Sequence, residues 1–240
     1  MNFTMPLRVV LSRTSHPGNI GAAARAMKTM GFADLALVAP RHFPDPDATA
    51  MAAGAADVLA SAQVFDTLEA ALADCTLVAG LSARARDLAH PPVPLRDAAR
   101  ELVDASAAGR VALVFGNETS GLTNEELLRC QRAVVIPANP RYSSLNLAAA
   151  VQVACYELAT TAGAHGVPAA GMKDPATGDD IRGLFEHLDA ATVASGYIDP
   201  ANPGRFLERM RRLFARAGLE REEVRVMRGM LAAFERKMKR

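Results

Sequence analysis

The stretch LRVVLSRTSHPGNIGAAARAMKTMG, residues 7–31, contains the unit from which the first part of this chain is built. Residues 7–11 form a short, mostly apolar run that predicts a buried strand. A Pro-Gly turn follows, and the pattern switches to a helix at about residues 20–30, which Gly31 ends, as glycine commonly does. A strand that leads through a polar loop into a helix predicts an α/β domain.

The same alternation continues to about residue 161. Further strands are predicted at residues 35–38, 64–65, 77–79, 111–115 and 134–136. Helices are predicted at about residues 51–59, 67–73, 95–107 and 124–130, and from about residue 143 to residue 161. Because few charges lie inside the strands, we expect a mostly parallel sheet with helices on both faces.

Loops rich in glycine, hydroxyl and amide side chains follow four of these strands. They are residues 14–20, 80–86, 116–121 and 136–146. Ligands of open α/β sheets bind outside the carboxyl ends of the strands. Since all four loops recur at that end, we predict that together they form a ligand crevice.

The fourth loop opens the segment IPANPRYSSLNLAAAVQVACYE, residues 136–157, where polar side chains crowd the start of a helix. These side chains belong to Asn139, Arg141, Tyr142, Ser143, Ser144 and Asn146. A serine hydroxyl oxygen accepts a hydrogen bond from a free backbone N–H of the first helical turn, so we expect the two serines to begin this helix. Taken alone, the segment fits a functional site and a capped buried helix equally well.

Length and composition predict a globular protein. The chain has 240 residues, of which 50% are hydrophobic, and can bury a full core. No apolar run approaches the roughly 20 residues that cross a bilayer, and the first residues lack the pattern of a secretory leader, so we expect a cytoplasmic protein without membrane contact. Cys75, Cys130 and Cys155 are widely spaced, which predicts buried thiols and neither disulfides nor metal ligands.

A segment rich in Gly, Pro and Ala separates the α/β part from a basic end of the chain. We predict a domain at residues 1–162, a linker at 163–179 and a helical module at 180–240. The helices predicted in the module are residues 180–194, 205–217 and 220–239. Residues 205–240 hold twelve Arg or Lys against five Glu, in a chain whose net charge is +1. This clustering indicates contact with a polyanion, and a solvated helix face is the alternative.

Several familiar motifs are absent from the sequence. There is no P-loop, no GxGxxG dinucleotide fingerprint and no GxSxG nucleophile elbow. His16 lies in a predicted site loop but has no second histidine at metal-ligand spacing, so we expect no metal centre. Arg25, flanked by alanine and methionine, either extends to solvent or holds a phosphate in the site. Four basic residues and no acid precede Asp34, and this positive field favours the phosphate.

Three ordered segments resemble the motifs of SPOUT-class RNA 2′-O-ribose methyltransferases. They are SHPGNIGAAARAMKTMG at residues 15–31, FGNETSGLTNEEL at 115–127 and IPANPRYSSLNLAAAVQV at 136–153, and the resemblance continues through LSARAR at 81–86 and GYIDPANPGRFLERMRRLFARA at 196–217. The resemblance implies a C-terminal trefoil knot in the α/β domain, a homodimer with its active site at the subunit interface, and S-adenosylmethionine as cofactor. The members most resembled methylate the ribose of nucleotide 32, a cytidine or uridine of the tRNA anticodon loop, so tRNA is the expected partner.

The resemblance also implies roles for matching residues. Cofactor contacts are implied for Leu81, Ser82, Ala83, Gly116, Ile136, Ser143, Ser144, Leu145 and Asn146. Catalytic positions are implied for Asn19, Arg25, Glu118, Tyr142 and Ser144. Because a guanidinium is a poor proton acceptor, we expect Arg25 to bind a phosphate and stabilise the alkoxide, with Ser144 or a water in proton transfer. RNA contacts are expected of Arg8, Arg13, Arg25, Arg84, Arg209, Arg211, Arg212 and Arg216.

Three other functions remain open on the sequence. The nearest is a 2′-O-ribose methyltransferase that acts on ribosomal RNA or on another tRNA position. A second is an RNA-binding protein on a degenerate methyltransferase scaffold, although the implied cofactor and catalytic residues are present. A small-molecule dehydrogenase would share the α/β layout, but the GxGxxG fingerprint is absent. Cofactor binding and mapping of the methylated nucleotide separate these functions.

Overall fold

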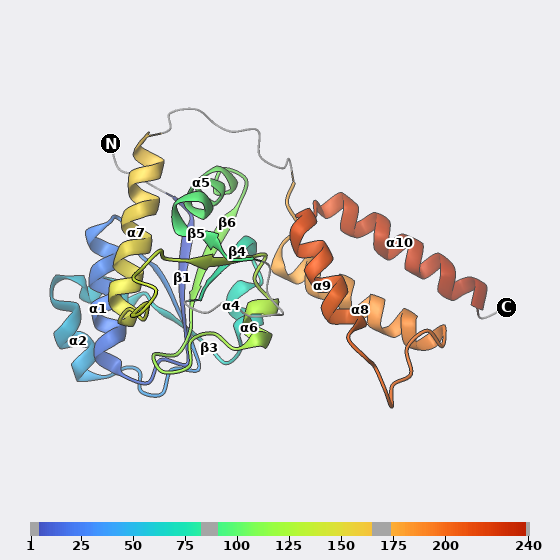
Figure 1. Ribbon diagram of the computed structural model, residues 1–240, viewed down its shortest axis with the longest axis horizontal. Coiled ribbons are helices and arrows are strands. Elements are labelled where there is room, and N and C mark those ends of the chain that lie inside the picture. The colour runs from blue at the N-terminus through green and yellow to red at the C-terminus, as the bar shows by residue number, and fades with distance from the viewer. Residues whose placement is uncertain (1–4, 83–90, 165–173, 239–240) are drawn as a thin grey trace.

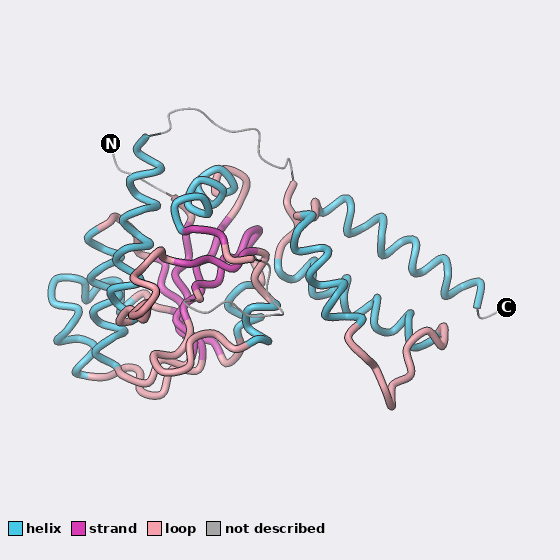
Figure 2. Tube along the Cα trace, viewed as in Figure 1, coloured by secondary structure: helices cyan, strands magenta, loops and turns pink. Residues whose placement is uncertain are grey.

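The computed structural model describes residues 5–82, 91–164 and 174–238. They contain a seven-stranded sheet of order β3-β2-β1-β6-β4-β7-β5, in which every pair of neighbours is parallel (Figures 1 and 2). The strands are β1 Leu7–Ser12, β2 Asp34–Val38, β3 Gln63–Phe65, β4 Cys75–Leu81, β5 Val93–Pro94, β6 Arg110–Phe115 and β7 Arg132–Val135. The predicted parallel α/β fold is confirmed, and all carboxyl ends of the strands lie at one edge.

Helices cover both faces of the sheet (Figure 1). They are α1 Pro17–Thr29, α2 Pro46–Ala52, η1 Ala53–Ala55, α3 Ala56–Ala60, α4 Leu68–Leu72, α5 Leu95–Ala105, α6 Asn124–Leu128 and α7 Leu147–Ala164. One core joins the sheet to α1, α2, α3, α5 and α7, and the other joins it to α4 and α6. Val9 belongs to the first core and Val10 to the second, because successive strand residues point to opposite faces.

Three helix starts and one strand differ from the sequence predictions. The helix predicted at residues 51–59 starts at Pro46 as α2, where Asp45 caps it, and η1 separates α2 from α3. Helix α1 begins at Pro17, earlier than residue 20, because the fixed φ of proline suits the first helical turn. Helix α7 begins at Leu147, and its cap is Asn146 instead of a serine. The Asn146 Oδ1 accepts hydrogen bonds from the backbone N–H groups of Ala148 at 3.0 Å and Ala149 at 3.3 Å. Strand β5 went unpredicted because its two residues are too few to show a period.

Arg8 lies inside the sheet with an exposed fraction of 5%. Its guanidinium pairs with Asp34 at 3.2 Å and with Asp74 at 2.7 Å, and donates to the backbone oxygen of Ala71 at 2.9 Å. Arg110 pairs with the same two carboxylates. A buried charge needs such partners, and removing one of them is strongly destabilising. Arg8 is therefore a structural residue, and the expectation that it contacts RNA is corrected.

The three cysteines are buried and their thiols are free, as predicted. Burial is the largest cause that raises the pKa of each of these thiols to about 12. A thiol with so high a pKa stays protonated at neutral pH and is a poor nucleophile or metal ligand. Cys75, Cys130 and Cys155 therefore act as small apolar side chains of the core.

A helical module follows in residues 174–238 (Figure 1). Its helices are α8 Gly178–Ala194, α9 Phe206–Ala217 and α10 Arg221–Met238. Its own core consists of Ala176, Leu184, Ala191, Leu219, Val224 and Leu231. Phe185 and Phe214 meet edge to face beside this core, with ring centroids 5.8 Å apart. No helix in the described parts of the chain is long and apolar enough to span a membrane.

The module is attached to the α/β part at the start of α8. The backbone N–H of Asp179 donates to the carbonyl oxygen of Ala73, just after α4, at 3.0 Å. Gly178 lies so close that a Cβ atom there would be 2.4 Å from the carbonyl oxygen of Leu72. Thr177 and Asp180 form a capping box that fixes this helix end. A small backbone junction thus holds the first helix of the module.

Candidate active site

The candidate site lies where four adjacent strands of the sheet end. Strands β1, β6, β4 and β7 are consecutive in the sheet, and the four predicted polar loops follow them. A cavity of about 140 Å³ opens between the last three of these loops and the start of α7. Its lining residues are Leu81, Ser82, Phe115, Gly116, Asn117, Glu118, Thr119, Ser120, Gly121, Ile136, Ser143, Ser144, Leu145, Leu147 and Ala150.

The loop after β6 is compact because its two glycines allow it to close on itself. A Cβ atom on Gly116 would lie 2.1 Å from the backbone of Gly121, so no larger residue fits. Gly121 has a φ of +67°, which only glycine adopts easily. The side-chain oxygen of Asn117 accepts the backbone N–H of Thr119 at 2.9 Å, and its nitrogen donates to the backbone oxygen of Arg13 at 2.8 Å. Asn117 therefore joins the loops after β6 and β1, a role that the sequence did not suggest.

The Glu118 carboxylate is the centre of a hydrogen-bond network. It accepts the backbone N–H groups of Ser15 at 2.9 Å and His16 at 3.1 Å, and the side-chain amide of Asn19 at 2.9 Å. Partial burial is the largest influence on the pKa of Glu118 and raises it, but these hydrogen bonds together outweigh it and leave the pKa below its ordinary value. Glu118 is therefore a carboxylate at neutral pH that holds the β1–α1 loop and is not poised to accept a proton.

Asn146 connects this network to the third motif. Its side-chain nitrogen donates to the Oδ1 of Asn19 at 3.0 Å, while its Oδ1 caps α7. The three segments singled out in the sequence therefore meet in one chain of hydrogen bonds from Asn146 through Asn19 to Glu118. These residues are separated by up to 127 positions, so only the folded sheet brings them together.

Most residues with an implied cofactor role line the cavity. Leu81, Ser82, Gly116, Ile136, Ser143, Ser144 and Leu145 do so. Asn146 lies beside the cavity in the network, and Ala83 and Arg84 fall outside the described residues. Sequence reasoning missed the lining residues Phe115, Asn117, Thr119, Ser120, Leu147 and Ala150. Their adjacency to the motifs was the available signal, but which side of a loop or helix faces a cavity depends on packing.

Arg25 and Tyr142 are not brought into this cavity. Tyr142 is 80% exposed and Arg25 is exposed on α1. In the described parts of the chain, no acceptor pairs with the Arg25 guanidinium. Arg25 is thus a cation presented at the surface, close along the chain to the network residue Asn19.

The arginines expected to meet RNA fall into different environments. Arg13 is about half-exposed and pairs with Glu126 at 2.8 Å. Arg209 and Arg216 are exposed and Arg212 is partly exposed, all on α9. Arg211 turns the other way, with its guanidinium 4.3 Å from the centroid of the Phe185 ring.

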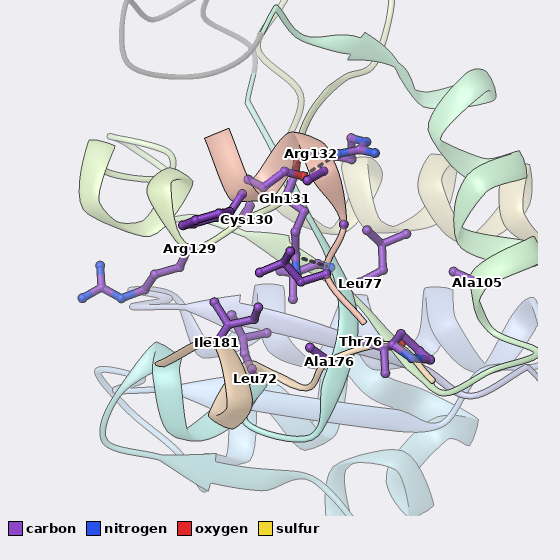
Figure 3. A pocket seen from close by; sticks show the side chains of 18 of the residues that line it. Leu72, Thr76, Leu77, Ala105, Arg129, Cys130, Gln131, Arg132, Ala176 and Ile181 are labelled. Carbon is purple, nitrogen blue, oxygen red and sulfur yellow. Dashed lines mark hydrogen bonds between the residues drawn. The ribbon is translucent and has the colours of Figure 1, made fainter. Parts of the chain in front are cut away.

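A larger cavity of about 740 Å³ lies between the α/β part and the module (Figure 3). Leu72, Leu77 and Ile181 are among its apolar lining residues, and Gln131 there accepts the N–H of Val78 at 2.8 Å. It reaches the first residues of β7, opposite to the end where the polar loops lie. Because the hydrogen-bond network that joins the three motifs does not reach this larger cavity, the smaller cavity is the candidate active site.

Comparison with known protein families identifies the family of the part that carries the smaller cavity. The family described as SpoU rRNA Methylase matches residues 6–156, which include every residue of the smaller cavity. The chain therefore belongs to the SpoU methylase family. The family described as tRNA methyltransferase TrmJ, C-terminal domain, matches residues 179–240.

Individual relatives make the similarity more specific. The chain is 47% identical to the tRNA (cytidine/uridine-2'-O-)-methyltransferase TrmJ of Escherichia coli strain K12, over 97% of this chain and 96% of that protein. The crystal structure of TrmJ from Z. mobilis ZM4 superimposes with a TM-score of 0.84 at 33% identity, covering 95% of this chain and 98% of that one. A structure concerned with 2-OH methylation of C/U34 on tRNA has a TM-score of 0.55 at 26% identity, and covers 67% of this chain and 99% of that one.

Proposed function

We propose that this protein transfers a methyl group from S-adenosylmethionine to the ribose 2′-hydroxyl of a cytidine or uridine in tRNA. The observation that carries the proposal is the meeting of the three motifs in the network of Glu118, Asn19 and Asn146 beside the cavity. The 47% identity to TrmJ along almost the whole chain supports tRNA as the substrate.

The chemistry of the smaller cavity fits S-adenosylmethionine, which supplies a methyl group activated on a positively charged sulfur. Phe115, Ile136 and Leu145 give apolar walls for the adenine ring. Ser143, Ser144 and the backbone of the 116–121 loop give donors and acceptors for the ribose and the methionine end. Glycine at position 116 leaves space and is required by its own loop.

The chain's residues then have to orient and activate the RNA hydroxyl. S-adenosylmethionine held by the cavity residues would supply the methyl group to the 2′-oxygen and would leave as the neutral thioether, and the hydroxyl proton would leave through Ser144 or a water. Arg25 binds the adjacent phosphate and stabilises negative charge developing on the oxygen. Asn19 and Asn146 fix the loops that surround the reacting groups.

The proposed homodimer explains why Arg25 lies at the surface. If two subunits pack so that the site forms between them, the exposed Arg25 of one subunit completes the cavity of the other. Arg25→Ala and Ser144→Ala homodimers would then each be inactive. Mixed after denaturation and refolding, they would recover roughly a quarter of wild-type activity, because each heterodimer has one intact site. Without recovery in verified heterodimers, the two residues act within one subunit.

We propose nucleotide 32 of the anticodon loop as the target. The structure concerned with C/U34 lacks a counterpart for about a third of this chain, whereas TrmJ relatives match the module as well. The α/β domain of residues 1–162, with its trefoil knot, would carry the chemistry. The module of residues 180–240, joined by residues 163–179, would hold the tRNA. Methylation of ribosomal RNA is the alternative outcome.

The test uses tRNA transcripts with single 2′-deoxy substitutions and cofactor labelled on the methyl group. Deoxyribose at nucleotide 32 removes the acceptor hydroxyl and should abolish labelling, whereas deoxyribose at nucleotide 34 should leave it intact. The reverse result would assign the target to position 34. Labelling of ribosomal RNA but of no tRNA would overturn the proposed substrate, and absence of cofactor binding by calorimetry would leave an RNA-binding protein.

A further inference from the structure

The loop between α8 and α9 presents one aromatic side chain to solvent in a fixed position. Tyr197 is 70% exposed. Its backbone belongs to a Schellman motif at the end of α8: the N–H of Tyr197 donates to the carbonyl oxygen of Thr192, and the N–H of Gly196 donates to that of Val193, each at 3.0 Å. Gly196 has the φ of +73° that this motif requires. The backbone therefore fixes where the exposed ring stands.

The ring of Tyr197 is also braced by its neighbours. It meets the Phe206 ring edge to face, with centroids 5.1 Å apart and an angle of 72° between the planes. The next residue, Ile198, is buried and anchors the loop. In an edge-to-face contact, the edge of one ring meets one face of the other, so at least one face of each ring can contact another partner. Tyr197 is thus a rigid aromatic surface with little conformational entropy to lose on binding.

Arginines form a stripe beside this ring. Arg205, Arg209, Arg212 and Arg216 are separated by four, three and four residues, so they share one face of α9. Within the described parts of the chain, only Arg205 of these four has an acidic partner, Glu208 at 3.1 Å. The stripe spans roughly 16 Å along the helix. Tyr197 lies at the N-terminal end of this stripe, because its ring contacts Phe206, the first residue of α9.

A track of cations that ends at an exposed aromatic ring matches the chemistry of single-stranded RNA. The cations follow phosphates, and the ring stacks on an unpaired base. The α8–α9 loop projects toward the bottom of Figure 1, the end of the molecule at which β1 also ends. RNA held there would lie on the same side as the candidate active site.

We infer that Tyr197 is a stacking platform for an unpaired nucleobase of the RNA substrate, next to the α9 arginine stripe. The inference rests on the proposed function, since it takes tRNA as the ligand. The inference adds a residue that distinguishes an unpaired base from a paired one, because only an unpaired base can stack on the ring. Phosphate contacts alone do not make this distinction.

The chain contains no tryptophan, so Tyr197→Trp places a single indole at this position of the full-length protein. Stacking on a base should quench its fluorescence when a tRNA transcript binds, and a fully paired RNA duplex of equal charge should not. Phe234→Trp, at an aromatic position of α10 that is 55% exposed, is the matched control and should stay unquenched. Equal quenching by tRNA and duplex, or of both tryptophans, would overturn the inference.

A second measurement covers the case in which the tryptophan variant folds poorly. Tyr197→Ala should weaken tRNA binding about 5- to 150-fold, as expected for loss of one stacked base, while Tyr197→Phe keeps the affinity. The value of kcat at saturating tRNA should not change. If wild-type protein methylates tRNA and folded Tyr197→Ala binds it normally, the inference fails and the proposed function stands. If the wild type methylates no tRNA, the proposed function fails.

Discussion

The candidate site and the helical module are held together in opposite ways. At the site, backbone N–H groups, amide side chains and one carboxylate link loops from three strands through hydrogen bonds. The module instead meets the α/β part at the helix end of Gly178 and Asp179 and through Arg132, whose guanidinium donates to the carbonyl oxygen of Ala215 on α9 at 3.0 Å. A cavity of about 740 Å³ lies beside these contacts. A hydrogen-bond network holds reacting groups at fixed distances, as catalysis requires. A small junction leaves the module free to adjust when it binds a large substrate such as tRNA.

The largest expected effect concerns the network. Glu118→Gln removes the negative charge that holds Ser15, His16 and Asn19, and should lower kcat by about 100-fold through misplaced loops. The KM for tRNA should stay nearly constant, because Glu118 lies away from the arginine stripe. Single-turnover methyl transfer and tRNA titration measure the two quantities.

A matched control for this change is Glu125→Gln, at an exposed position in the first turn of α6. It removes the same charge without touching the network and should leave both kcat and KM unchanged. A comparable loss in both variants would mean that net charge, and not the network, controls the rate.

The next effect concerns the module. Changing Arg209, Arg212 and Arg216 together to Gln should weaken tRNA binding at least tenfold. It should also reduce the slope of log affinity against log salt by about three, one for each phosphate contact. Arg211→Gln should leave the salt slope intact, because Arg211 packs on Phe185. Equal slopes for the triple variant and wild type would exclude a role of the stripe in phosphate binding.

A smaller effect is expected from the junction. Gly178→Val places side-chain atoms against the carbonyl oxygen of Leu72, and relief of this clash should displace α8. We expect KM for tRNA to rise about tenfold, with cofactor binding unchanged and a loss of roughly 1–3 kcal/mol in stability. Gly229→Ala is the control, since open space surrounds that glycine on α10. Unchanged tRNA binding in Gly178→Val would show that the position of α8 at this junction does not control the affinity for tRNA.

The smallest effect is the pH dependence of the network. Because the pKa of Glu118 in the folded protein lies below its ordinary value, its carboxylate stabilises the fold at neutral pH. This contribution is complete above the ordinary pKa of the group and is lost as pH falls through the lowered folded value. Thermal unfolding of wild type and Glu118→Gln should therefore converge in acid. A gap between the two that widens as pH falls would contradict the lowered pKa.

The sequence predicted the alternation of strands and helices well because buried apolar runs and helix breakers are local signals. It missed β5, which has only two residues. It also missed the cap of α7, because Ser143, Ser144 and Asn146 can all cap a helix and only the structure shows that Asn146 does. At the site, the motifs identified Glu118, Asn19 and Ser144, but not Asn117. Its hydrogen bonds to the loop after β1 cross more than 100 positions and leave no local pattern.

By itself, the sequence determined the α/β class, the motifs of a SpoU methylase and the basic end of the chain, because periodicity, residue identity and charge are properties of the chain. Tertiary structure decided which arginines are exposed and can bind RNA. Arg8 is buried by the sheet between Asp34 and Asp74, and Arg211 faces Phe185, while Arg209 and Arg216 on the same helix as Arg211 reach solvent. The physical reason is that burial and pairing depend on neighbours distant in the chain, which no local stretch of sequence specifies.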